Sequence, residues 1–242
     1  MVISALRYAF SETSSAYDSH LQPMILPMLT TMLNDNDLDN RRLALTTFNS
    51  TARNKLELIT PHLGEILPLT MKETIIRPEL VREVTMGPFK HKVDDGLELR
   101  KSAYETLYAL MEVAFNRVPV PTLYDRVVAG VSDEHDIKIL CCLMLSKLLT
   151  LASGEFARRL DSISEGFRAV LSYKPKENAV KQELEKMAEH NKAIIKVMLQ
   201  VNKTLALESA DARTWKENWE WTRKEFPQLV RVAEDELSDK DR

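Results

Sequence analysis

Several residue types and segment types are scarce in this chain of 242 residues. Only six glycines occur, and good helix formers such as Leu, Ala, Glu and Lys dominate, which favours an all-α protein. The two cysteines, Cys141 and Cys142, are adjacent in an apolar run, so they cannot build a disulfide framework and are expected as buried thiols in a reducing compartment. No apolar run approaches the roughly 20 residues of a membrane span, and MVISALRYAF lacks the features of a secretory signal.

An excess of charge of one sign is also missing. The chain has 33 basic and 36 acidic residues, closely interspersed, and a net charge of −3. Such a balance is typical of a solvated surface rather than of a protein that attracts nucleic acid or membrane. We therefore expect no nucleic-acid partner and no membrane partner.

Amphipathic periodicity predicts helices over most of the chain. The expected segments are about 2–10, 18–33, 38–52, 60–72, 97–115, 121–131, 137–151 and 155–172, then a long helix from Lys176 and a short last helix. Acidic residues at 35 and 37 are available to cap the third segment.

Three of these helices can be aligned with one another, starting at Arg41, Arg100 and Lys138. Each has a small residue three positions after the basic residue, a large apolar residue four beyond that, and an acidic residue two before it. This pattern is typical of the inner helix of a HEAT-type helix pair, so we predict an all-α HEAT-repeat α-solenoid, a right-handed superhelical array.

The spacing of the aligned helices reveals an insert. From 100 to 138 is 38 residues, near the expected period of about 40, whereas from 41 to 100 is 59 residues. The excess of about 20 residues has the length of the segment from Ile75 to Asp94. One repeat of the array therefore contains an insertion.

The insert has the pattern of a β-hairpin at about residues 78–95. Pro78 prevents simple continuation of the preceding helix, 80–86 and 89–93 alternate in character, and Gly87-Pro88 between them is typical of a turn. Because an isolated hairpin is marginally stable in water, it either packs on a neighbouring repeat or contacts a partner. The candidate contact residues are Arg82, Val84, Met86, Gly87, Pro88, Phe89, Lys90, His91 and Lys92.

The C-terminal part is expected to close the array. We divide the chain into repeats with the hairpin at 1–175, capping helices at 176–233 and a charged, disordered tail at 234–242. The long helix carries an apolar heptad seam, which indicates a capping helix or, alternatively, a coiled-coil dimer. Trp215, Trp219 and Phe226 share one face of the last short helix, while Trp221 points elsewhere and is a possible contact residue.

No catalytic constellation is visible. The five histidines are scattered without metal-ligand spacing, and no glycine-rich phosphate loop occurs. The cation row Arg41, Arg42, Arg53 and Lys55 could contact phosphate, but in a net-acidic chain an intramolecular ladder or an acidic protein partner is favoured. We expect no enzyme activity, no cofactor and no metal.

The insert and its flanks, KETIIRPELVREVTMGPFKHKVDDGLELRKSAYETLY, closely resemble the C-terminal region of the cullin-associated, neddylation-dissociated family. NRRLALTTFNSTARNK, HDIKILCCLMLSKL and RRLDSISEGFRAVLSYKPKENAVKQELEK resemble it as well. The resemblance covers roughly residues 1–190.

This resemblance implies a regulator of cullin–RING ubiquitin ligases in the cytoplasm and nucleus. Its C-terminal HEAT repeats would bind the N-terminal domain of an unmodified cullin, and its hairpin would compete there with the adaptor–receptor module and promote receptor exchange. Members have many more repeats upstream, so we expect this chain to be a C-terminal fragment or a split subunit whose partners include those repeats. The alternative is a general HEAT scaffold, such as a transport receptor or a phosphatase scaffold.

Overall fold

The computed structural model describes residues 8–12, 14–87, 89–175, 177, 179–205, 207 and 212–240, with the backbone only for residues 86, 89, 91, 239 and 240. The chain divides into two compact units, Met1–Pro119 and Val120–Arg242. Within the described ranges the regular elements are helices and one two-stranded sheet, so the predicted all-α class with an inserted hairpin is confirmed. Over those ranges, no helix combines the length and the apolar character that crossing a bilayer requires.

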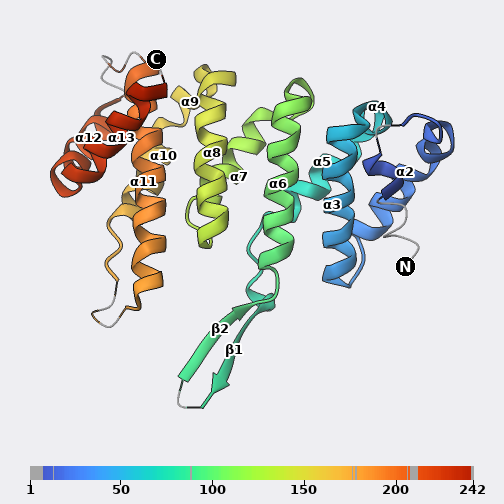
Figure 1. Ribbon diagram of the computed structural model, residues 1–242, viewed down its shortest axis with the longest axis horizontal. Coiled ribbons are helices and arrows are strands. Elements are labelled where there is room, and N and C mark those ends of the chain that lie inside the picture. Colours follow the sequence, from blue (N-terminus) through green and yellow to red (C-terminus); the bar gives the residue numbers. More distant parts are fainter. Residues whose placement is uncertain are drawn as a thin grey trace. The chain divides into compact units, whose positions relative to one another are not determined.

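In the first unit, helices that are neighbours in the chain pack against each other in pairs (Figure 1). Its elements are α2 (Asp18–Leu33), α3 (Leu38–Asn54), α4 (Leu56–Ile59), η1 (Thr60–His62), α5 (Leu63–Lys72), η2 (Pro78–Leu80), β1 (Val81–Met86), β2 (Phe89–Asp94), α6 (Leu97–Val113) and η3 (Phe115–Arg117). Helix α2 packs on α3 and α5 packs on α6. The hairpin connects α5 to α6, so the insertion lies inside a helix pair, as the repeat spacing predicts.

The contact between α3 and α6 is the core of this unit. Ala44 and Ala103, the small residues that the repeat alignment matches, are both fully buried. The hydroxyl oxygen of Thr106 on α6 lies 3.1 Å from the backbone carbonyl of Leu45 on α3, and 2.7 Å from the Ser102 carbonyl of its own helix. A side chain this short reaches a backbone carbonyl only where two helices approach closely, so the small residues serve the purpose predicted for them.

The regular elements among the described residues of the second unit are all helices. Its elements are α7 (Val120–Gly130), α8 (His135–Leu151), α9 (Ser153–Arg158), α10 (Leu160–Leu171), α11 (Lys181–Thr204), α12 (Arg213–Glu225) and α13 (Pro227–Lys240). Helix α7 packs on α8, α8 on α11, α10 on α12 and α11 on α13. Cys141 and Cys142 are buried on α8, and burial raises the pKa of both thiols.

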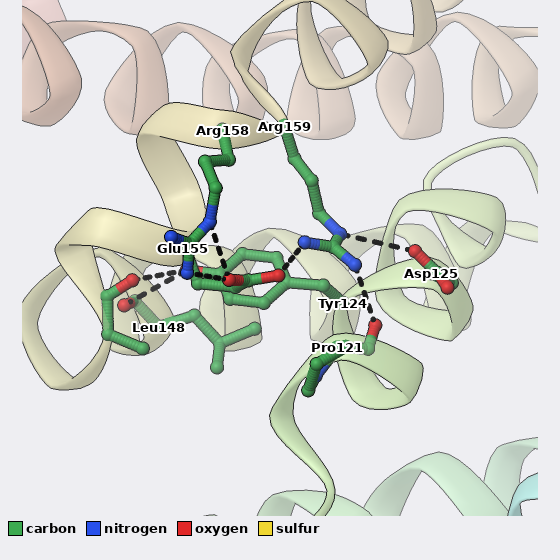
Figure 2. A network of polar contacts seen from close by, with 8 residues as sticks. Pro121, Tyr124, Asp125, Leu148, Glu155, Arg158 and Arg159 are labelled. Atoms are coloured by element: carbon green, nitrogen blue, oxygen red, sulfur yellow. Dashed lines mark hydrogen bonds and ion pairs between the residues drawn. The ribbon is translucent and has the colours of Figure 1, made fainter.

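The single helix expected over 155–172 is interrupted at Arg159, which lies between α9 and α10 with φ −106° and ψ 10°. Figure 2 shows the contacts that Arg159 makes at this break. The guanidinium binds Glu155, donates to Asp125 of α7 at 3.1 Å and to the Pro121 carbonyl at 3.4 Å, and lies 5.6 Å from the centre of the Tyr124 ring. The Tyr124 hydroxyl donates to two carbonyls at the end of α8, each at 3.2 Å. These contacts hold Arg159 out of helical geometry.

The long C-terminal helix begins at Lys181 rather than at Lys176. Ile194, Met198 and Val201 of its predicted seam are buried, but Leu184 is 41% exposed. The C-terminal half of α11 therefore supplies the packing, while its first turns are largely exposed.

The last two helices pack back onto α11 and α10. Trp215 is fully buried beside Phe167 of α10, with ring centroids 6.3 Å apart. Trp219 and Phe226 pack against the apolar cluster Ile195, Leu199, Val230 and Ala233. Trp215, Trp219 and Phe226 therefore all pack against other apolar side chains, but against two different groups, and Phe226 follows α12 instead of lying within it.

The expected disordered tail at 234–242 is wrong for residues 234–240, which continue α13. Leu237 packs against the same apolar cluster, and the carboxylate of Glu236 binds both Lys192 and Lys196 of α11. The charged composition of this segment predicted disorder, because composition does not reveal partners that lie about 40 residues earlier in the chain. Residues 241 and 242 lie outside the described residues.

This lysine pair makes the docking of α13 sensitive to acid. Hydrogen bonds from Lys192 and Lys196 lower the pKa of Glu236 to about 2. Because the folded pKa lies below the unfolded one, the stabilisation is complete above about pH 4.5 and is lost as the pH falls towards about 2. The protection factors of the α13 amides, measured relative to intrinsic exchange at each pH, should therefore fall over this range. In Glu236→Gln the acid-dependent part should vanish, whereas Asp235→Asn, a change at an exposed neighbour, should preserve it.

Candidate functional site: the inserted hairpin

The two strands of the insert form an antiparallel ladder that extends away from the helices of its unit (Figure 1). The register pairs Arg82 with Val93, Val84 with His91 and Met86 with Phe89. The other set of positions pairs Val81 with Asp94, Glu83 with Lys92 and Thr85 with Lys90. The two predicted alternations are therefore in phase, with the apolar-rich residues in the first set and the mostly polar ones in the second.

The turn depends on Gly87. Its φ is +61°, in the left-handed region that residues with a Cβ rarely adopt. Gly87 is the first of the two residues between the strands. Two-residue hairpin loops need a positive φ at this position to match the twist of the strands. Pro88, predicted as its turn partner, lies outside the described residues.

An alanine at this position should loosen the hairpin without affecting the helices. Gly87→Ala places a Cβ at positive φ, which costs about 1 kcal/mol, whereas Gly64→Ala in α5 meets open space at an ordinary φ and should stabilise slightly. NMR chemical shifts and amide exchange of residues 81–86 and 89–94 report the change. Unaltered strand protection in Gly87→Ala would contradict this role of Gly87.

The described side chains of the hairpin are largely in solvent. Arg82, Glu83, Thr85, Lys90 and Lys92 are exposed, and Val84 and Val93 are half-buried. Met86, Phe89 and His91, predicted as contacts, have a described backbone, and their side chains lie outside the described residues.

Two of the predicted cationic contacts already have partners. Arg82 donates to both carboxylate oxygens of Asp95, at 2.7 and 3.1 Å, and these hydrogen bonds lower the pKa of Asp95. Lys90 lies 2.6 Å from Glu83 across the strands. The Lys92 ammonium has no ion-pair or hydrogen-bonding partner among the described residues. Of the three predicted cations, Lys92 is therefore the most available.

The base of the hairpin is fixed by a buried ion pair that sequence reasoning missed. Asp94, the last residue of β2, lies 2.9 Å from Arg100 in the first turn of α6, and that arginine side chain is 3% exposed. The other oxygen of Asp94 accepts from the backbone amide of Gly96 at 2.9 Å, and the amide of Asp95 donates to the Leu80 carbonyl at 3.0 Å. A Cβ at Gly96 would lie 3.0 Å from Leu80, so a glycine permits this close approach.

A second buried charge cluster holds the segment that precedes the hairpin. The Glu73 carboxylate at the end of α5 is 2% exposed and binds Arg41 of α3 and, at 2.8 Å, Arg77 in the segment that leads to the hairpin. The strand that starts at Val81 thus leaves from a segment held by α3 and α5. The hairpin is anchored on both sides, by Glu73 before it and by Arg100 after it.

The cation row predicted on the first unit is an intramolecular ladder. Arg41 binds Glu73, Arg42 lies 3.5 Å from Asp39 and 3.9 Å from Glu98, Arg53 lies 3.0 Å from Glu112, and Lys55 binds Asp18. These pairs occupy the cations that would otherwise contact a phosphate. Among the residues that the structure describes, no group of three or more His, Cys, Asp or Glu is arranged to hold a metal ion.

Known proteins match almost the whole chain. A family model described as "TATA-binding protein interacting (TIP20)" matches residues 58–223. "Cullin-associated NEDD8-dissociated protein 1, C-terminal part" of Emericella nidulans is 50% identical over 239 residues, which are 98% of this chain and 23% of that protein.

Animal relatives match over a shorter length. "Cullin-associated NEDD8-dissociated protein 2" of Mus musculus is 40% identical over 197 residues, 81% of this chain and 16% of that protein. "Cullin-associated NEDD8-dissociated protein 1" of Drosophila melanogaster is 39% identical over 198 residues, 82% of this chain and 16% of that protein. The chain thus spans less than a quarter of the length of these relatives. It belongs to the cullin-associated, NEDD8-dissociated family and matches the C-terminal region of that family.

Proposed function

We propose that this chain is a non-enzymatic regulator of cullin–RING ubiquitin ligases. In this proposal it binds the N-terminal domain of an unmodified cullin, and its hairpin competes with the adaptor–receptor module, so that receptors exchange. Cullin association in the names of the relatives supports the partner. Because the chain covers 23% of the fungal relative's length, we also propose that upstream HEAT repeats, in the same protein or in a separate subunit, complete the cullin contact.

The observation that carries the proposal is the anchored, projecting hairpin. Each strand has six residues, which at a rise of about 3.3 Å per residue reach about 20 Å beyond the base. A ribbon that packed on its own repeat would need no such reach. The buried pairs at its base fix its direction, so less conformational entropy is lost when it binds.

The ion pairs of the hairpin can also be exchanged for contacts with a partner protein. The Arg82–Asp95 and Lys90–Glu83 pairs are largely exposed, and solvent screening leaves such pairs little net stabilising effect. A partner surface can therefore replace either pair at low cost.

Binding to an immobilised cullin N-terminal domain, with and without a saturating adaptor–receptor module, tests the proposal. We expect capture of the chain in the absence of the module and displacement in its presence. A general HEAT scaffold of another class would give no capture. Capture that the module leaves unchanged would contradict the competition.

A further inference from the structure

The second unit carries a stacked pair of side chains. The guanidinium carbon of Arg168 on α10 is 3.4 Å from the ring centroid of Trp221 on α12. At this distance the guanidinium lies against the indole face, and the stack restricts the arginine to few rotamers. Trp221, singled out in the sequence as a possible contact residue, is thus half of a composite surface.

Buried groups hold this pair in place. Arg168 donates from Nη1 to the Asn218 side-chain oxygen at 3.3 Å. Asn218 is 7% exposed, and its amide donates to the carbonyl and the hydroxyl of Ser164 at 2.6 and 2.8 Å. Trp221 in turn makes an edge contact with Phe226, with centroids 5.9 Å apart. The guanidinium is therefore positioned by an amide whose own orientation is fixed.

The remaining donors of Arg168 are unused. Among the described residues, its Nε and Nη2 groups make no hydrogen bond, and they are absent from the buried unpartnered atoms, so they reach solvent. Arg168 lines a cleft of about 590 Å³ between α10 and α12, together with the hydroxyls of Ser172 and Thr214. A fixed guanidinium with a pair of open N–H groups matches the two oxygens of a carboxylate or a phosphate.

The other charged residues of the cleft favour a carboxylate monoanion over a phosphate dianion as the ligand. Glu165 and Glu217 also line it; Arg213 pairs with Glu217 at 3.0 Å, whereas Glu165 has no partner among the described residues. One uncompensated carboxylate repels a phosphate dianion about twice as strongly as a carboxylate monoanion. We propose that the Arg168–Trp221 cleft binds the carboxylate side chain of an acidic residue on a partner protein.

Side-chain NMR of the full chain tests this binding with the peptide Ac-Ala-Ala-Glu-Ala-Ala-NH2 as the probe. We expect a saturable shift of the Arg168 Nε–H and Trp221 indole N–H resonances, and no shift with the peptide that has Gln in place of Glu. Arg159 is an internal control, since its Nε already donates to Asp125. The indole of Trp215, which donates to Asn202 at 2.8 Å, reports folding in every variant.

Two variants separate binding from a purely structural stack. Arg168→Lys keeps the charge but loses the two-pronged geometry, so the response of the Trp221 indole to the Glu peptide should disappear. Glu165→Gln removes the competing carboxylate and should tighten binding about two- to fivefold. Equal shifts with the Glu and Gln peptides, an unchanged affinity in Arg168→Lys, or tighter binding of inorganic phosphate than of the Glu peptide would each overturn the proposal.

Discussion

A chain in which residues 82–93 are replaced by the turn Asn-Gly should lose its competition with an adaptor–receptor module for the cullin N-terminal domain. Val81 and Asp94 are paired across the ladder, so a two-residue turn can join them. The replacement keeps Asp94, and with it the buried pair to Arg100, so the helices retain their contacts. The change removes the projecting part of the hairpin and leaves its base.

We expect the module to displace this variant at least about tenfold less effectively, because without the hairpin the two proteins no longer need the same surface; a tenfold change corresponds to about 1.4 kcal/mol. Competition titrations on the immobilised cullin domain measure the effect. Amide exchange of α3 and α6, unchanged from the parent chain, is the control for folding. Equal displacement of the variant and the parent chain would show that the hairpin has no part in the competition.

The largest effect on stability is expected at Glu73. Glu73→Ala removes the carboxylate that two arginines share, and it leaves Arg41 and Arg77, 13% and 18% exposed, without this partner. Breaking a buried ion pair from one side typically costs about 3 kcal/mol or more, because the remaining charge is poorly solvated. We therefore expect unit Met1–Pro119 to lose about 3 kcal/mol.

Native-state amide exchange resolves this loss, since all three tryptophans lie in the other unit and their fluorescence is blind to it. The slowest amides of α3 and α6 should exchange about a hundredfold faster in Glu73→Ala. Glu65→Ala, at an exposed position on α5, should change exchange by less than about fivefold. If amide exchange were the same in the two variants, the Glu73 cluster would not contribute to the stability of this unit.

The hairpin could be predicted because its signals are local or periodic. Repeat spacing located the insert, alternation defined its strands, and Gly87-Pro88 marked the turn; the strands begin and end within one residue of the expected positions. The small residues Ala44 and Ala103 were likewise predictable, since each repeat provides an independent reading of the same position.

Features that depend on distant side chains could not be predicted. The break at Arg159 requires Asp125, 34 residues earlier, and the ordered end of α13 requires Lys192, 44 residues before Glu236. Arg100 is instructive in another way. The repeat alignment identified it as the basic position of an inner helix. In this repeat the residue also forms an ion pair with Asp94 of the insert, and the aligned helices at Arg41 and Lys138 offer no such insert for comparison.

In the proposed mechanism, the hairpin occupies the surface that the adaptor also binds. Photo-cross-linking from a reactive residue placed at Lys92, which is exposed and unpaired among the described residues, tests this directly. We predict cross-links to the cullin N-terminal domain that disappear when the adaptor–receptor module is bound first. Cross-links of equal yield with the module in place, from a chain that still binds the cullin, would show that the hairpin does not occupy the adaptor's surface.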